Sequence, residues 1–173
     1  HIPGVDMSSG SLGQGISAAV GMAIAAKLSG DSYRVYTLLG DGEIQEGQVW
    51  EAAMLAAHRK LDNLVVIVDN NNLQIDGAID DVNSPYPIDK KFEAFNFHVI
   101  NIDGHDFDAI DAAFKEARET KGQPTAIIAK TVKGKGVSFM ENQASWHGAA
   151  PNDEQYEVAM ADLEKVGEAL CQK

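Results

Sequence analysis

The sequence has a single cysteine among its 173 residues, Cys171. One cysteine cannot form a disulfide within the chain, which predicts a protein of a reducing compartment, the cytoplasm. Long hydrophobic runs are also missing. The longest run of small apolar residues, Ile16 to Ala26, is too short to cross a bilayer, so we expect neither a membrane span nor a targeting segment.

Basic residues are scarce: 14 Lys and Arg face 26 Asp and Glu, and the formal net charge is −12. This balance argues against a nucleic-acid partner, which would require clustered Lys and Arg. It does not exclude a phosphate ligand, because a bound cation and backbone N–H groups can balance its charge. Apolar residues make up 45% of the chain, and the length fits one globular domain, residues 1–173.

Helix and strand patterns alternate along the chain. Helices are predicted over residues 11–28, 46–60, 89–95, 106–120 and from Asn152 or Asp153 onward; strands are predicted over residues 33–39, 64–68, 97–102 and 125–131. The last helix places an apolar stripe on one face: Tyr156, Met160, Leu163, Val166 and Leu170. The alternation predicts an α/β fold with a parallel sheet flanked by helices, and such sheets bind ligands at the carboxyl ends of their strands.

Two polar motifs follow two of these predicted strands directly. Gly40-Asp41-Gly42 supplies a carboxylate between glycines, and Asp69-Asn70-Asn71-Asn72 supplies amide oxygens. Each motif alone is typical of an ordinary turn. Together, at neighbouring strand ends, they predict a site for Mg²⁺, with Asp41, Asn71 and the Leu73 carbonyl as oxygen ligands and with phosphate oxygens completing the shell.

At these residues the sequence resembles a known family. The run GDGEIQEGQVWEAAMLAAHRKLDNLVVIVDNNNLQIDG resembles the thiamine diphosphate motif of transketolases. PGVDMSSGSLGQGISAAVGMAIAAKL and KTVKGKGVSFMENQASWHGAAPND resemble the segments on either side of it, so the likeness covers nearly the whole chain. The sequence of its C-terminal part most resembles the N-terminal subunit of split, two-gene transketolases. The resemblance implies the thiamine diphosphate-binding fold, and within it the pyrophosphate-binding module.

The resemblance also implies roles for particular residues. Asp41, Asn71 and Leu73 would bind Mg²⁺ or Ca²⁺, and Gly42 would contact the diphosphate. Further contacts to thiamine diphosphate would come from Gly10, Leu12, Asn71, Ile75 and His147. Catalytic roles are implied for His147, facing the diphosphate or substrate, and for Glu46. Glu46 and Glu51 would lie in an acidic network at a dimer interface.

As implied by the resemblance, the reaction is transfer of a two-carbon ketol unit between sugar phosphates, a ketose and an aldose. The upstream residues of the family domain and its pyrimidine-binding domain are missing here. We therefore expect the chain to be inactive alone. It would work with a pyrimidine-binding domain or C-terminal transketolase subunit, in a homodimer or heterotetramer. The small residues of the first predicted helix favour self-association as well.

Two other hypotheses remain open from the sequence. The first is another thiamine diphosphate enzyme, of the deoxyxylulose phosphate synthase or 2-oxoacid dehydrogenase type, which the wording of Glu43 to Gly47 disfavours. The second is a non-catalytic cofactor-binding fragment. Gly13 to Ala18 also matches a dinucleotide fingerprint, but that fingerprint requires a preceding strand and a loop is predicted there.

Overall fold

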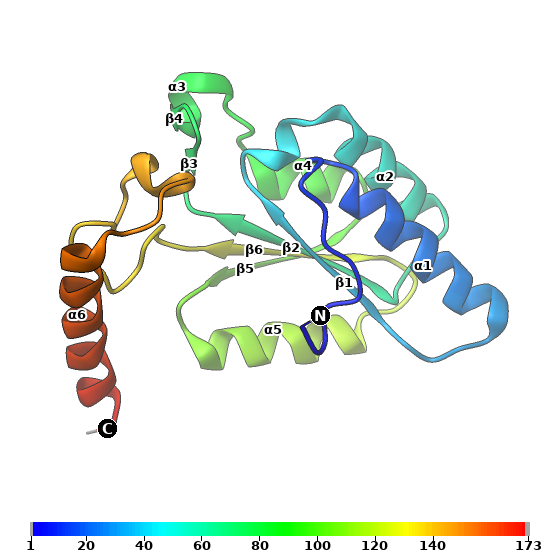
Figure 1. The fold of residues 1–173 in the computed structure, drawn as a ribbon. Coiled ribbons are helices and arrows are strands. Elements are labelled where there is room, and N and C mark those ends of the chain that lie inside the picture. Colours follow the sequence, from blue (N-terminus) through cyan, green and yellow to red (C-terminus); the bar gives the residue numbers. More distant parts are fainter. Residues whose placement is uncertain (1, 172–173) are drawn as a thin grey trace.

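The computed structural model describes residues 2–171, so the chain's opening residue, His1, lies outside the described part. Four strands form one sheet in the order β1–β2–β6–β5, and every neighbouring pair is parallel. Their bounds are β1 Val35–Gly40, β2 Leu64–Asn70, β5 His98–Asp103 and β6 Thr125–Lys130. The predicted parallel α/β sheet is confirmed (Figure 1).

Helices cover the two faces of the sheet unequally. On one face lie α1 (Gly15–Ser29), α2 (Gly47–His58) and α4 (Ile88–Ala94), and on the other lies α5 (Phe107–Glu119) (Figure 1). The larger core fills the first face and includes Ile16, Val49, Val66 and Phe92. The strand β2 is central and reads as a continuous apolar run, because a parallel strand with both faces covered has no solvent side.

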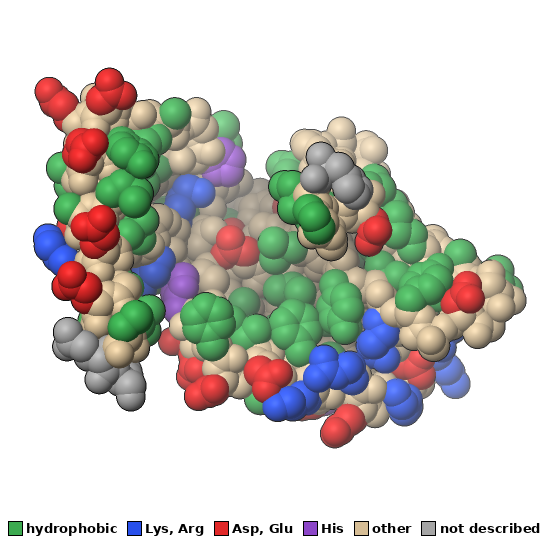
Figure 2. Space-filling model, turned by 60° about the horizontal axis from the view of Figure 1, so that its bottom comes forward, with side chains coloured by type: hydrophobic (Ala, Val, Ile, Leu, Met, Phe, Trp, Pro, Cys, Tyr) green, Lys and Arg blue, Asp and Glu red, His purple; other side chains and the backbone are tan. Residues whose placement is uncertain are grey.

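The second face retains a hollow of about 250 Å³ beside α5, lined mainly by apolar side chains such as Leu38, Ile67 and Phe114. Figure 2 shows hydrophobic side chains gathered on this side of the molecule. No helix within residues 2–171 is long and apolar enough to cross a membrane.

Two helices begin at the caps that the sequence predicted. Asp106 caps α5 by accepting hydrogen bonds from the N–H groups of Asp108 and Ala109, as its position predicted. The first helix starts later than predicted, at Gly15 rather than Ser11, since Gly13 turns the chain with a φ of +81°. The last helix, α6 (Asp153–Cys171), begins at the predicted cap, where Asn152 accepts from the N–H of Gln155.

Several short elements escaped the sequence analysis. They are the 3₁₀ helices η1 (Glu43–Gln45) and η2 (Ala144–His147), the hairpin strands β3 (Leu73–Gln74) and β4 (Gly77–Ala78), and the helix α3 (Ile79–Asn83). The hairpin and η1 lie beyond the carboxyl ends of β2 and β1, so they shape the edge at which a ligand is expected.

Candidate functional site

Asp41 occupies the centre of the candidate site. It follows β1 directly and its residue surface is only 1% exposed. One carboxylate oxygen accepts a 2.9 Å hydrogen bond from the N–H of Gly42, and the other accepts a 2.6 Å bond from the N–H of Asn72. The backbone N–H of Asp41 donates to the carbonyl of Asp69. The loops after β1 and β2 are thereby joined at one carboxylate, as the positions of the two motifs predicted.

The charge of Asp41 is only partly balanced by the protein. Burial raises the pKa of Asp41 above its ordinary value, and the neighbouring carboxylate of Asp69 acts in the same direction. The hydrogen bonds from Asn72 and Gly42 and the charge of Lys130 oppose the increase without cancelling it. A divalent cation at this carboxylate would supply the missing positive charge.

The loop after β2 brings the amide of Asn71 to the same edge. Its side-chain oxygen accepts a 2.9 Å hydrogen bond from the N–H of Leu73, which fixes the orientation of the amide. Gln74 lies across from Gly42: a Cβ placed on Gly42 would be 3.1 Å from the Gln74 Cβ. The side-chain Nε2 of Gln74 is buried and has no hydrogen-bond partner among the described residues. This unpaired nitrogen is a candidate donor to a ligand oxygen.

Tyr86 holds the second loop in place, and the sequence analysis did not single it out. Its hydroxyl meets the side-chain oxygens of Asn70, at 2.5 Å, and Asn72. Burial raises the pKa of Tyr86, and the charge of Asp41 adds to this effect. The phenol therefore stays protonated and bridges two asparagines on either side of Asn71. Nothing in the local sequence pattern indicated this contact.

Glu43 is a second functional candidate that the sequence analysis missed. Its carboxylate accepts hydrogen bonds from the N–H of Gly13, at 3.0 Å, and of Gly40, at 3.1 Å. The turn before α1 is thus tied to the end of β1. A Cβ on Gly13 would lie 2.7 Å from the Glu46 Cβ, so the two segments are in close contact there. Only the match of the whole run to a family motif signalled Glu43.

His147 ends the short helix η2, which packs against the hairpin strand β3. The imidazole is exposed, and its Nδ1 lies 3.5 Å from the Nζ of Lys133. A histidine and a lysine from the loop that follows β6 therefore stand beside the hairpin that contains Leu73 and Gln74. This arrangement places the predicted His147 at the same edge of the sheet as Asp41.

The remaining predicted site residues are exposed at the surface of the described chain. They are Gly10, Leu12, Glu46, Glu51 and Ile75. Ile75 is in the turn of the β3–β4 hairpin and Glu46 is the N-cap of α2. Within residues 2–171, none of them forms a hydrogen bond with Asp41. Their proposed contacts are with a cofactor or a second chain, so they stay predictions.

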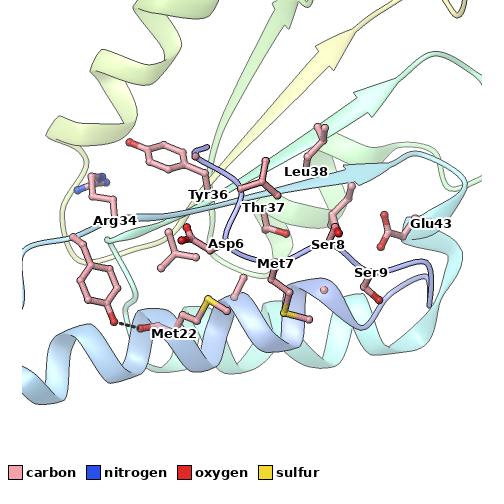
Figure 3. A pocket seen from close by; sticks show the side chains of 17 residues that line it. Asp6, Met7, Ser8, Ser9, Met22, Arg34, Tyr36, Thr37, Leu38 and Glu43 are labelled. Carbon is pink, nitrogen blue, oxygen red and sulfur yellow. Dashed lines mark hydrogen bonds between the residues drawn. The ribbon is translucent and has the colours of Figure 1, made fainter. Parts of the chain in front are cut away.

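A cavity of about 880 Å³ runs along the open edge of β1. It is bounded by the segment that includes Asp6 and Met7, by α1, and by the β1 side chains of Tyr36 and Leu38 (Figure 3). Glu43 closes its end nearest the carboxyl edge of the sheet. The cavity lies along the β1 side of the sheet and not at the carboxyl ends of the strands. It is therefore distinct from the candidate site around Asp41.

The donors at the candidate site suit a hard cation and a diphosphate. The carboxylate of Asp41 and the amide oxygen of Asn71 can serve as oxygen ligands of a cation. The buried Nε2 of Gln74, which has no partner among the described residues, can donate a hydrogen bond to a phosphate. Among residues 2–171 no group of three or more His, Cys, Asp and Glu side chains is placed to hold a metal ion by itself. A cation here would therefore rely on amide, carbonyl and phosphate oxygens in addition to Asp41.

The fold is that of an α/β domain with a parallel sheet, and the polar side chains described above gather at the carboxyl ends of its strands, where such folds bind ligands. A family model described as the thiamine diphosphate binding domain of transketolase matches residues 1–165. The chain therefore belongs to the transketolase family and corresponds to its thiamine diphosphate-binding part.

Named relatives agree. The chain is 46% identical over 164 residues to a 6-deoxy-6-sulfo-D-fructose transketolase subunit of Clostridium sp. (strain MSTE9), covering 95% of this chain and 60% of the relative. It is 42% identical over 170 residues to one subunit of the apulose-4-phosphate transketolase of Phocaeicola vulgatus, covering 98% and 60%. It is 50% identical over 147 residues to human transketolase, covering 83% and 23%. The chain thus spans about three fifths of these bacterial subunits.

Solved structures show the same fold. Transketolase from Campylobacter jejuni superposes with a TM-score of 0.86 at 38% identity, over 91% of this chain and 26% of that one. The transketolase of Pichia stipitis in complex with sedoheptulose-7-phosphate gives a TM-score of 0.82 at 28% identity, over 96% and 29%. The predicted thiamine diphosphate-binding fold is therefore confirmed.

Proposed function

We propose that this chain holds the diphosphate and the metal of thiamine diphosphate in a transketolase that moves a two-carbon ketol unit from a ketose to an aldose phosphate. The carrying observation is the buried Asp41 carboxylate, which is fixed by the N–H of Asn72 beside the oriented amide of Asn71. When bound, thiamine diphosphate supplies an electron sink for carbanion chemistry. The residues of this chain position that group.

Each residue has a distinct task in this proposal. Asp41, the Asn71 amide and the Leu73 carbonyl take Mg²⁺, or Ca²⁺ in its place, while Gly42 and Gln74 face the diphosphate. The proposal is supported by the raised pKa of Asp41, since a carboxylate that the protein leaves under-compensated gains most from a cation.

His147 and Glu46 complete the assignment. His147 and Lys133 together form a polar pair that can contact a phosphate or a sugar hydroxyl next to the hairpin. Glu46 and Glu51 are exposed at the start of α2, free to meet a second copy of the assembly. We assign them to a contact between two active sites, with Gly10, Leu12 and Ile75 against the cofactor.

The assembly needs a second component. The relatives that share three fifths of their length with this chain are named as subunits, and the larger transketolases contain more than this part. We propose a pyrimidine-binding subunit or domain as the partner, in a dimeric assembly in the cytoplasm. This chain would supply the metal and diphosphate half of each active site.

Calorimetric titration with thiamine diphosphate tests the first half of the proposal. We expect binding with Mg²⁺ or Ca²⁺ and little binding after the metal is removed with a chelator. Binding that is equally tight without metal contradicts the assigned ligands. A folded chain that binds nothing, both alone and with its pyrimidine-binding partner, contradicts the cofactor assignment.

Ketol transfer by the reconstituted assembly tests the second half. The donor panel should contain xylulose 5-phosphate, fructose 6-phosphate, 6-deoxy-6-sulfo-D-fructose and apulose 4-phosphate, since the relatives' names differ in their sugars. We expect turnover of one donor by the assembly and none by this chain alone. Cofactor binding without transfer from any donor would support a binding module instead of an enzyme component.

A further inference from the structure

The last helix, α6, is almost uncovered by the rest of the described chain. It runs for 19 residues, about 28 Å, yet Ala159 is its only buried residue and every residue from Leu163 to Cys171 is exposed. In Figure 1 it lies apart from the sheet and its flanking helices.

One short contact anchors the helix near its middle. The hydroxyl and the N–H of Ser138 donate to the carboxylate of Asp162, at 2.6 and 3.0 Å. Leu163 packs over Gly136, where its Cδ2 lies 3.1 Å from the position that a Cβ would take. The helix is therefore attached to the loop that also carries η2 and His147, but its second half extends beyond that attachment.

The exposed face of α6 is apolar. The exposed members of this face share an arc of about 120°, at roughly 100° per residue: Tyr156, Met160, Leu163, Val166 and Leu170. Tyr156 is 53% exposed and Leu170 is 62% exposed, so the stripe is open at both ends, on either side of the contact between Leu163 and Gly136. A lone helix of this length is marginal in water, and most helix stability in proteins comes from packing an apolar face.

An acidic row borders the stripe on one side. Glu157, Glu164 and Glu168 lie at helical spacing next to Met160, and α6 as a whole carries six acidic residues and one lysine. Figure 2 shows hydrophobic and acidic side chains side by side on this helix, at the left of the molecule. The helix thus presents an apolar stripe with one negative edge.

This charge pattern selects among possible occupants. A membrane surface favours amphipathic helices whose polar face is rich in Lys and Arg, the opposite of α6. A second copy of α6 would bring its own acidic row to the contact, and like charges oppose association there. A protein groove with an apolar floor and a Lys/Arg edge satisfies both features of the helix.

We propose that α6 is the docking helix for the pyrimidine-binding part of the assembly, which seats the stripe in an apolar groove with one basic edge. The inference rests on the proposed function. Because the loop that anchors α6 also carries His147, docking there would fix the partner relative to the diphosphate end of the site.

The test uses the complete two-component assembly, with association measured by sedimentation velocity and without reference to activity. Leu170→Gln places a polar group on the stripe, and the neighbouring Ala169→Gln makes the matched change off the stripe. We expect Leu170→Gln to raise the Kd for the partner about tenfold or more and Ala169→Gln to leave it within twofold. Circular dichroism of both variants checks that α6 remains helical.

Two further measurements distinguish a lost contact with the partner from a loss of folding in the Leu170→Gln variant. The double variant Glu164→Lys/Glu168→Lys leaves the stripe intact, and we expect it to weaken association about tenfold and to flatten the salt dependence of the Kd. Cys171 lies beside Leu170 at the end of the helix and is exposed. We expect the partner to slow its alkylation several-fold.

Equal Kd values for Leu170→Gln, Ala169→Gln and the wild type would overturn the proposal, as would equal alkylation of Cys171 with and without the partner. A stripe variant that changes only self-association would assign the face to a second copy. If the wild-type components associate through α6 but transfer no ketol group, the proposed function is contradicted while the docking role of α6 is still supported.

Discussion

The carboxylate of Asp41 accepts a 2.6 Å hydrogen bond from the backbone N–H of Asn72, 31 residues further along the chain. Through this bond the loops at the ends of β1 and β2 share one buried acceptor. The hydroxyl of Tyr86 then meets the side chain of the same Asn72. The proposed metal ligand Asp41, the loop that carries the second proposed ligand and a supporting phenol are thus connected by hydrogen bonds within the chain, which preorganises the candidate site.

Asp41→Asn should remove metal-dependent binding of thiamine diphosphate. The substitution deletes the negative charge and turns an N–H₂ group toward the N–H of Gly42 or Asn72. The cation therefore loses its charged ligand, and one of the two N–H groups loses its acceptor. We expect the affinity measured by calorimetry with Mg²⁺ to fall by about a hundredfold or more.

Asp76→Asn is the matched control for this change. Asp76 is an exposed acid in the neighbouring hairpin turn, so the variant loses the same charge without touching the site. We expect its affinity to stay within about twofold of the wild type. Equal losses in both variants would mean that net charge, and not ligation, governs binding.

The stability of the metal-free chain should depend on pH through Asp41. Since burial raises the pKa of Asp41 above 3.8, the folded chain holds this proton more tightly than the unfolded chain between 3.8 and the raised pKa. The free energy of unfolding contributed by this group therefore falls as pH rises through that window. Mg²⁺ competes with the same proton, so metal affinity should rise with pH over the same range.

Urea denaturation of wild type and Asp41→Asn over a pH series measures this effect as a difference. The subtraction matters because hydrogen bonds from Gly122 and Lys27 lower the pKa of Asp62, which contributes the opposite slope in both proteins. A difference that does not change with pH would show that Asp41 titrates normally in the folded chain.

Tyr86→Phe should weaken metal and cofactor binding without unfolding the chain. The ring keeps its packing, while the contacts to the side chains of Asn70 and Asn72 are lost. Removing a group that orients a ligand loop reduces affinity about tenfold to a hundredfold, and we expect the lower end here. Tyr33→Phe makes the same chemical change where the hydroxyl donates to the Met22 carbonyl, away from the site, and should leave affinity unchanged.

The sequence predicted the parts of this site that depend on local chemistry. The apolar run of β2 is what a covered parallel strand is expected to show, and the carboxyl ends of neighbouring parallel strands meet at one edge. Asp41 and Asn71 were therefore predicted to lie near each other. The helix cap at Asp106 could also be predicted from the sequence, since its carboxylate accepts hydrogen bonds from N–H groups only two and three residues away.

The supporting contacts could not be predicted in this way. Glu43 bonds to the N–H of Gly13 across 30 residues, and Tyr86 reaches Asn70 and Asn72 through the path of an irregular segment. Such pairs depend on how loops return over the sheet, which no helical or strand periodicity encodes. The two-residue strands β3 and β4 are too short to give any period.

Glu43→Ala should destabilise the chain more than an ordinary surface change. It leaves the N–H groups of Gly13 and Gly40 without their charged acceptor, and we expect the free energy of unfolding to fall by about 2 kcal/mol. Glu93→Ala, which loses only an exposed ion pair with Lys90, is the control and should have little effect in urea denaturation. Similar midpoints for the two variants would show that Glu43 does not clamp the turn.

Gly42→Ala tests whether Gln74 acts on the ligand. The φ of Gly42 is −67°, which any residue can adopt, so only space opposes the new methyl group, 3.1 Å from the Gln74 Cβ and 3.3 Å from its Oε1. The side chain of Gln74 should move aside, and we expect affinity for thiamine diphosphate with Mg²⁺ to fall roughly tenfold. Gly47→Ala, whose Cβ meets nothing within 4 Å, should bind as the wild type does.

A double-mutant cycle separates this effect from a direct clash between Gly42→Ala and the diphosphate. If the loss passes through Gln74, then Gln74→Ala alone should weaken binding by a similar factor, and adding Gly42→Ala should cost little more. If the two losses multiply instead, the methyl group itself obstructs the diphosphate and the buried Nε2 of Gln74 contributes separately. If Gln74→Ala binds thiamine diphosphate with the affinity of the wild type, Gln74 does not contact the ligand, and its unpaired donor has no role in binding.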